Sequence, residues 1–110
     1  MFRLLDEVET TGVGNTFVLP YTVLNHTIDC YFTNSGGSVT ALTVDLEGSI
    51  DGQKWYTLAS HEFTSDELND KKAMFHSVDR MVSYIRANII TLTETGTTKI
   101  YVRYIPESRR

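Results

Sequence analysis

The sequence predicts an all-β domain: an antiparallel, jelly-roll-like β-sandwich with one short helical turn. Segments rich in Thr, Val, Ile, Tyr and Phe recur along the chain, and this is the composition of β-strands. Glycine-marked turns separate these segments, as expected for the strands of a sandwich or barrel. Several segments alternate apolar and polar residues, which indicates strands with one buried face. With 110 residues, the chain is expected to form one sandwich domain over residues 1–110.

The individual strands follow from the local pattern. In the segment 39–50, Leu42, Val44 and Leu46 alternate with polar residues, so one face is apolar and the other polar. The segment 27–33 alternates in the same way, and its Cys30, the one cysteine of the chain, is interpreted as a small buried hydrophobe. Further strands are predicted at residues 4–8, 16–19, 55–63, 74–78, 81–90 and 98–105.

Two short signals predict how the strands are connected. Thr64 and Glu67 have the spacing of a capping box, in which each side chain bonds the backbone N–H of the other residue. This spacing predicts one helical turn over residues 64–69. The pair Asp51-Gly52 predicts a tight reversal of the chain, because glycine adopts a positive φ without steric cost.

Composition and charge limit the classes of partner. The net charge of −4 argues against a nucleic-acid partner, which requires a basic surface. No apolar stretch approaches the ~20 residues that cross a bilayer, so no membrane association is expected. The first residues place acids directly after Leu5 and lack the apolar region of a signal peptide. We therefore expect a protein without a signal peptide that is made and kept in a cytosol.

No pattern in the sequence indicates an enzyme, a metal site or a cofactor. His26, His61 and His76 fall on separate segments without the spacing of metal ligands. Helix capping and solvation explain the acidic cluster at residues 66–70 as well as cation binding does. The sequence has neither a phosphate-binding loop nor a nucleophile elbow. The protein is therefore expected to be non-enzymatic, with no catalytic residues, no cofactor and no metal.

The most specific constellation is a hairpin motif. Gly48, Asp51, Gly52 and Trp55 fit the pattern Gly-Ser-x-Asp-Gly-x-x-Trp, and a later strand reads Tyr-Ile-Arg, ending at Arg86. We interpret these five residues as a structural hairpin. Trp55 is expected to be mostly buried, with its indole N–H seeking a partner. Arg86 is expected to pin the hairpin through one of three carboxylates, Asp45, Glu47 or Asp51.

Over residues 44–104, this motif and its spacing resemble discoidin domains and carbohydrate-binding modules, which are β-sandwiches. The resemblance implies a module that recognises a host surface glycan. Such modules contact sugar through exposed aromatic side chains in loops. Trp55 stands at a position interpreted as core, and Tyr21 is the one loop aromatic expected, so these positions argue against sugar binding.

Nearly the whole chain also resembles short phage structural proteins. The shared features are the Leu-Leu-Asp start at residues 4–14, the hairpin motif, and segments at residues 63–68, 75–78 and 84–88. This resemblance implies a non-enzymatic virion protein that binds and stabilises a phage capsid surface in a decoration or cement role. Its partner would be the major capsid protein or another virion protein. The same resemblance implies a homo-oligomer, with a trimer favoured, in a virion assembled in the host cytoplasm.

The segment 1–14 is a possible docking or edge segment. Its apolar side chains would be costly to leave in water, so we expect partner docking through Met1, Phe2, Arg3, Leu4 and Leu5. The alternative is that these residues close the core of the domain itself. Two further functions stay open at this point: a carbohydrate-binding module, and a phage tail-associated structural protein.

Overall fold

Alternation of apolar and polar residues produces strands along most of the chain. The computed structural model describes residues 2–106 and contains one helix, α1 (Ser65–Asp70), between the sixth and seventh strands. The strands are β1 (Phe2–Val8), β2 (Gly12–Val13), β3 (Phe17–Val23), β4 (His26–Ser35), β5 (Val39–Ser49), β6 (Tyr56–Glu62), β7 (Lys72–Ser77), β8 (Val82–Glu94) and β9 (Thr97–Pro106).

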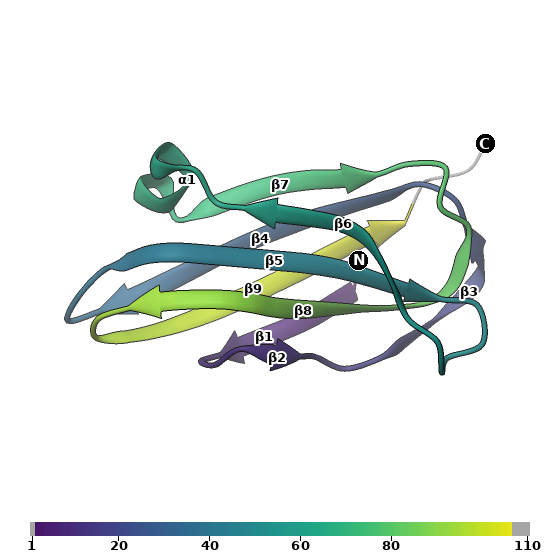
Figure 1. Ribbon diagram of the computed structural model, residues 1–110, viewed down its shortest axis with the longest axis horizontal. Helices are drawn as coiled ribbons and strands as arrows, with labels where there is room; N and C mark the ends of the chain where they lie inside the picture. The colour runs from purple at the N-terminus through teal and green to yellow at the C-terminus, as the bar shows by residue number, and fades with distance from the viewer. Residues whose placement is uncertain (1, 107–110) are drawn as a thin grey trace.

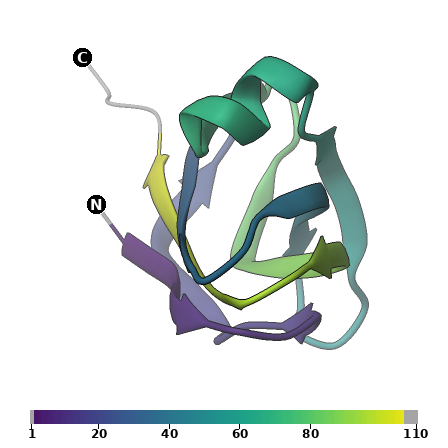
Figure 2. The same cartoon turned by 90° about the vertical axis from the view of Figure 1, so that its left-hand side faces the viewer.

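The strands form two sheets that pack face to face, as Figures 1 and 2 show. The four-stranded sheet has the order β1-β9-β4-β7, and the five-stranded sheet has the order β2-β8-β5-β6, with β3 also paired to β8. Every pairing is antiparallel. Most connections cross from one sheet to the other, which gives the jelly-roll topology. The predicted fold class is therefore confirmed.

The core lies between the inner faces of the two sheets. Leu42, Val44 and Leu46 of β5 are fully buried, which confirms the alternation predicted for this strand. Cys30 of β4 faces them from the four-stranded sheet and is also fully buried. Burial raises the pKa of the Cys30 thiol to about 12, with a smaller contribution from the negative charge of Asp29. Cys30 therefore packs as a small hydrophobe and stays a thiol.

The predicted helical turn is present and carries the predicted capping box. The Thr64 hydroxyl accepts a hydrogen bond from the backbone N–H of Glu67, at 3.3 Å. The Glu67 carboxylate accepts in return from the backbone N–H of Thr64, at 2.9 Å. The backbone bond from Thr64 lowers the pKa of Glu67. The helix ends at Lys71, which adopts a left-handed conformation with φ of 63°.

The N-terminal segment forms β1, an edge strand of the four-stranded sheet, and the expected docking role is corrected for Leu4 and Leu5. Leu4 and Leu5 are 1% and 4% exposed within the core, so their side chains have no surface to offer a partner. Arg3 is exposed and forms an ion pair with Asp6 at 3.1 Å. Met1 and the side chain of Phe2 lie outside the described residues. The alternative that these residues close the core of the domain therefore holds for Leu4 and Leu5.

A buried histidine, His26 at the start of β4, links Tyr104 of β9 to the connection between β7 and β8. His26 is 2% exposed. Its Nε2 donates to the backbone carbonyl of Arg80 at 2.8 Å, so its Nδ1 accepts from the Tyr104 hydroxyl at 2.5 Å. Burial lowers the pKa of His26 below its ordinary value, against a smaller opposing effect of the Arg80 carbonyl. The neutral imidazole is therefore the form that the fold holds.

We expect this histidine to make stability fall in acid. The unfolded chain protonates His26 near its ordinary pKa of 6.5, whereas the folded chain protonates it only at lower pH. The unfolded state then binds more protons as pH falls from about 6.5 toward the lowered pKa, and stability decreases across that window. Urea midpoints measured between about pH 8 and pH 5 should show this loss. The dependence should be weaker in His26→Gln, and an unchanged dependence would contradict the assignment.

Candidate functional site

The turn between β5 and β6 is held by Asp51. Its Oδ1 accepts from the backbone N–H groups of Gln53 and Lys54, at 2.9 and 3.0 Å, and from the Ser49 hydroxyl at 3.0 Å. The bond from Lys54 is the largest of the effects that lower the pKa of Asp51, followed by that from Gln53. The Ser49 hydroxyl also accepts from the backbone N–H of Gly52 at 2.8 Å. These bonds fix the turn in one conformation.

The two glycines of the motif have different physical roles. Gly52 has a φ of 80°, which favours glycine, and a side chain there would meet the ring of Tyr84 at 3.2 Å. Gly48 lies inside the sandwich, where a Cβ would be 2.7 Å from Leu58 and 2.8 Å from Val82. One glycine therefore makes the turn possible, and the other allows the hairpin to pack closely on the core.

Arg86 lies on the outer face of the five-stranded sheet, because its neighbours Ile85 and Ala87 point into the core. Its Nε donates to Glu47 Oε1 at 2.6 Å across the β5–β8 pair. Asn88 donates to the second oxygen, Oε2, of Glu47 at 3.0 Å. The Arg86 and Glu47 side chains are only 23% and 13% exposed. Of the three carboxylates that the sequence offered to Arg86, the structure selects Glu47.

Trp55 belongs to this outer cluster and lies outside the core. The guanidinium carbon of Arg86 lies 4.1 Å from the centroid of the Trp55 ring. Trp55 is half-buried, which corrects the expectation of a mostly buried tryptophan. The reason is local: β6 begins only at Tyr56, so the turn rather than strand alternation sets the direction of Trp55. The Arg86 guanidinium lies over one face of the ring.

The Trp55 face is the name used below for Trp55, Arg86, Glu47, Asn88 and Asp45. Asp45 lies opposite Asn88 in the β5–β8 register. It is 9% exposed, and its Oδ1 is buried without a hydrogen-bond partner among residues 2–106. A buried polar atom without a partner is rare and calls for an explanation such as a water or a ligand. The sequence offered Asp45 only as a candidate partner of Arg86 and did not single out Asn88, although both occupy outward positions of their strands, like Arg86 and Glu47.

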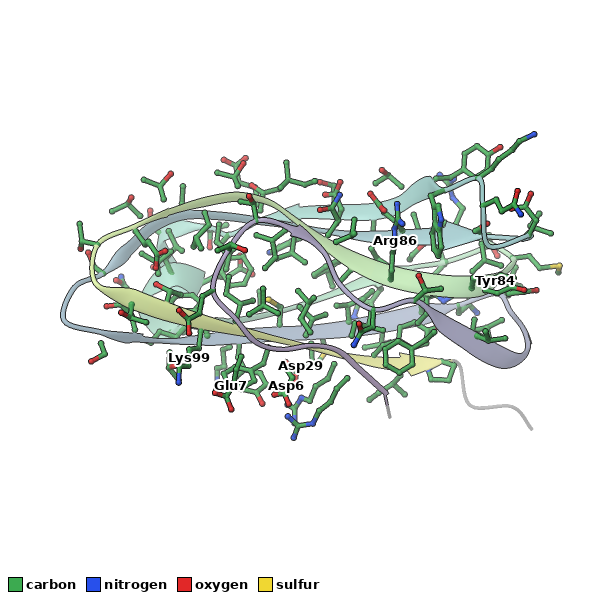
Figure 3. The ribbon with its side chains drawn as sticks, turned by 90° about the horizontal axis from the view of Figure 1, so that it is seen from below. Asp6, Glu7, Asp29, Tyr84, Arg86 and Lys99 are labelled. Carbon is green, nitrogen blue, oxygen red and sulfur yellow. The ribbon has the colours of Figure 1, made fainter. Side chains whose placement is uncertain are left out.

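The opposite side of the sandwich carries a comparable group of side chains that is more exposed to solvent. Figure 3 shows Arg86 on one broad side, and Asp29, Glu7 and Lys99 on the other. Arg103 forms an ion pair there with Asp29. The guanidinium carbon of Arg103 lies 4.9 Å from the centroid of the Tyr31 ring. The Arg103 and Asp29 side chains are 35% and 24% exposed. This second aromatic–arginine–carboxylate group offers matched controls for the first.

The described part of the chain holds neither a metal-binding cluster nor a membrane-spanning helix. Within residues 2–106, no three His, Cys, Asp or Glu side chains cluster in a way that could hold a metal ion. The helix that the structure describes is too short to cross a bilayer. The absence of catalysis stays a prediction.

Comparison with known proteins identifies structural neighbours. No family model and no curated protein matches the sequence. The C-terminal domain of a chitobiase from Bacteroides fragilis aligns with a TM-score of 0.51 and 17% identity, over 80% of this chain and 60% of that chain. A carbohydrate-binding module of family 4 (CBM4) aligns with a TM-score of 0.50 and 15% identity, over 93% of this chain and 66% of that chain. The chain thus spans less than two thirds of either neighbour, and the likeness establishes the β-sandwich fold.

Proposed function

We propose that the protein is a carbohydrate-binding module that holds a glycan on its Trp55 face. The observation that carries this proposal is a half-buried tryptophan beside a linked row of charged and amide groups on an outer sheet face. A sugar ring has one apolar C–H face and a rim of hydroxyls. An aromatic surface suits the former, and planar groups such as guanidinium, carboxylate and amide suit the latter.

The bonds within the face leave some groups free for a ligand. Glu47 uses both carboxylate oxygens, one for Arg86 and one for Asn88. Arg86 engages Glu47 through Nε, which leaves its two terminal nitrogens as donors for a ligand. The Asn88 carbonyl oxygen is a possible acceptor. Because Glu47 holds both neighbours in place, binding requires little further ordering of side chains.

The fold comparisons support this proposal at a coarse level. The two neighbours described above are a chitobiase domain and a carbohydrate-binding module. Their likeness to this chain concerns the sandwich, and the assignment of the Trp55 face comes from the contacts of Trp55, Arg86 and Glu47. The sequence-based argument against sugar binding rested on Trp55 being core and on Tyr21 as the one loop aromatic. Trp55 is half-buried beside Arg86, and the side chain of Tyr21 lies outside the described residues.

Replacing Trp55 by alanine should weaken glycan binding by about tenfold or more, equivalent to at least about 1.4 kcal/mol. The reason is that the substitution removes the aromatic ring over which the Arg86 guanidinium lies. We expect Trp55→Phe to retain part of the affinity. The matched control is Tyr31→Ala, which removes the aromatic ring beside Arg103 on the opposite sheet and should leave binding unchanged.

The measurement begins with a glycan array, followed by calorimetry with the glycan that binds best. Far-UV circular dichroism and urea unfolding show whether each variant is folded. The bound glycan should be recovered uncleaved, as expected for a non-enzymatic module. Absence of binding to every glycan would overturn the proposal. An equal loss of glycan affinity in Trp55→Ala and Tyr31→Ala would overturn the assignment of the glycan site to the Trp55 face.

The virion hypothesis stays a prediction. Capsid decoration, tail association, a capsid-protein partner and location in a virion all rest on the sequence resemblance. Burial of Leu4 and Leu5 removes the two core residues of the expected docking segment from the surface. No contact among residues 2–106 favours that role over glycan binding, so carbohydrate binding is the function proposed.

A further inference from the structure

A second surface, at one end of the sandwich, is apolar and shares no residue with the Trp55 face. The β5–β6 turn and the β7–β8 connection meet at this end, on the right in Figure 1. Between them is a hollow of about 220 Å³, lined by Ile50, Tyr56, Leu58, Asp79, Arg80, Met81 and Val82. The name end patch is used for this set of residues.

Three large apolar side chains of the end patch are strongly exposed. Ile50, Tyr56 and Met81 are 74%, 63% and 62% exposed. Single exposed apolar side chains are normal, but several grouped around a hollow indicate a contact surface. Tyrosine and methionine are also enriched in protein–protein interfaces. The bonds of Asp51 fix the turn that carries Ile50, so this surface is ordered before any contact forms.

The end patch also carries one acid and one base, in adjacent positions. Asp79 and Arg80 are both exposed, and neither forms an ion pair within residues 2–106. Their backbone is fixed, because Asp79 N–H donates to the Asn25 side chain at 3.1 Å and Arg80 N–H donates to the Leu24 carbonyl at 3.0 Å. Asp79 has a φ of 60°. Two opposite charges therefore stand at set positions beside the apolar hollow.

We infer that the end patch is a contact between two copies of this chain, related by a two-fold axis. In a two-fold contact, when one residue of the first copy meets a different residue of the second copy, the reverse pair also forms. We place Asp79 of each copy against Arg80 of the other copy. The apolar side chains of the two copies then cover each other. A patch with one acid, one base and an apolar centre is complementary to itself, whereas a glycan would find few hydrogen-bonding groups among Ile50, Met81 and Leu58.

This inference is independent of the proposed function and goes beyond it. A pair joined through the end patches carries two Trp55 faces. Two linked sites on a repeating glycan raise the effective concentration of the second binding event. A contact of this limited extent falls among the small, weak interfaces, so the pair should dissociate on dilution.

Sedimentation velocity across a wide range of protein concentrations tests the contact. We expect the wild-type mass to double as concentration rises. Arg80→Asp places two acids against each other, and Asp79→Lys places two bases against each other. Either substitution alone should weaken association by about tenfold or more. Lysine is tolerated at positive φ in this chain, since Lys71 has a φ of 63°.

Mixing the two single variants gives the sharpest outcome. Their charges are complementary only in a mixed pair, so the mixture should associate more strongly than either variant alone. Ile105→Asp, at an exposed position of β9 in the other sheet, should associate like the wild type. Circular dichroism checks that every variant is folded.

Three results would overturn the inference. A wild type that stays monomeric at every concentration excludes the contact, and glycan binding by that monomer would leave the proposed function standing. Association that persists unchanged in both single variants would place the contact elsewhere on the molecule. A trimer whose association is unchanged by Arg80→Asp and by Asp79→Lys would likewise exclude a two-fold contact through the end patch.

Discussion

Leu4→Ala is expected to lower the free energy of unfolding by about 2–5 kcal/mol, the usual cost of emptying a buried leucine site. Leu4 is 1% exposed and belongs to the core. Its strand, β1, pairs with β9 at the edge of the four-stranded sheet. The loss therefore combines the transfer of the leucine side chain with the cavity that remains. Urea unfolding followed by the fluorescence of Trp55 measures it.

The matched control is Leu24→Ala. Leu24 is 37% exposed, and substitutions at open surface positions usually change stability by only about 0.5 kcal/mol. If Leu4 were a docking residue, Leu4→Ala would leave the unfolding midpoint unchanged and would only weaken binding to a partner. A midpoint equal to that of the wild type would thus contradict the core position of this side chain.

The two leucines show why sequence alone misled at the N-terminus. Leu4 and Leu5 are adjacent, so strict alternation allows only one of them to face the core. The β1–β9 register shifts between Arg3 and Leu5 and again between Leu5 and Val8. A bulge of this kind turns consecutive residues toward the same side. No local pattern in the sequence indicates such a bulge, so the sequence left open whether the two leucines dock on a partner or close the core.

The regular strands could be predicted because their pattern is repeated over many residues. The alternation of Leu42, Val44 and Leu46 specifies one buried face, and β5 has that face in the structure. The capping box of Thr64 and Glu67 was equally local, and it was found at the predicted place. β3 differs, because it continues through position 20 to Val23 with an irregular register, where the proline suggested an end.

The Trp55 face was predictable only in part. The sequence shows which of its residues point away from the core, since Glu47 and Arg86 both occupy outward positions of long strands. Which carboxylate meets Arg86 depends on the β5–β8 register, which places Glu47 directly opposite Arg86. The register in turn depends on a shift between Thr43 and Val44. Such a shift arises from long-range pairing, and a single sequence does not reveal it.

The Arg86–Glu47 pair is expected to show a coupling energy of about 1–3 kcal/mol in a double-mutant cycle with Arg86→Ala and Glu47→Ala. Both side chains are largely buried, at 23% and 13% exposure, and their Nε–Oε1 distance is 2.6 Å. Removing Arg86 leaves Glu47 with Asn88 as its remaining partner and uncovers the Trp55 ring. The fluorescence of Trp55 in the folded state should therefore change along with the unfolding midpoint.

The Arg103–Asp29 pair supplies the comparison for this cycle. Its side chains are 35% and 24% exposed, so water screens the two charges more effectively, and exposed pairs usually contribute under about 1 kcal/mol. Its coupling should also weaken more when salt is added, since screening by ions acts most strongly on exposed charges. Equal coupling energies and equal salt dependence in the two pairs would mean that burial gives the Trp55 face no added rigidity. A larger and salt-resistant coupling for Arg86–Glu47 would show that Arg86 and Asn88 are held in place before a glycan arrives.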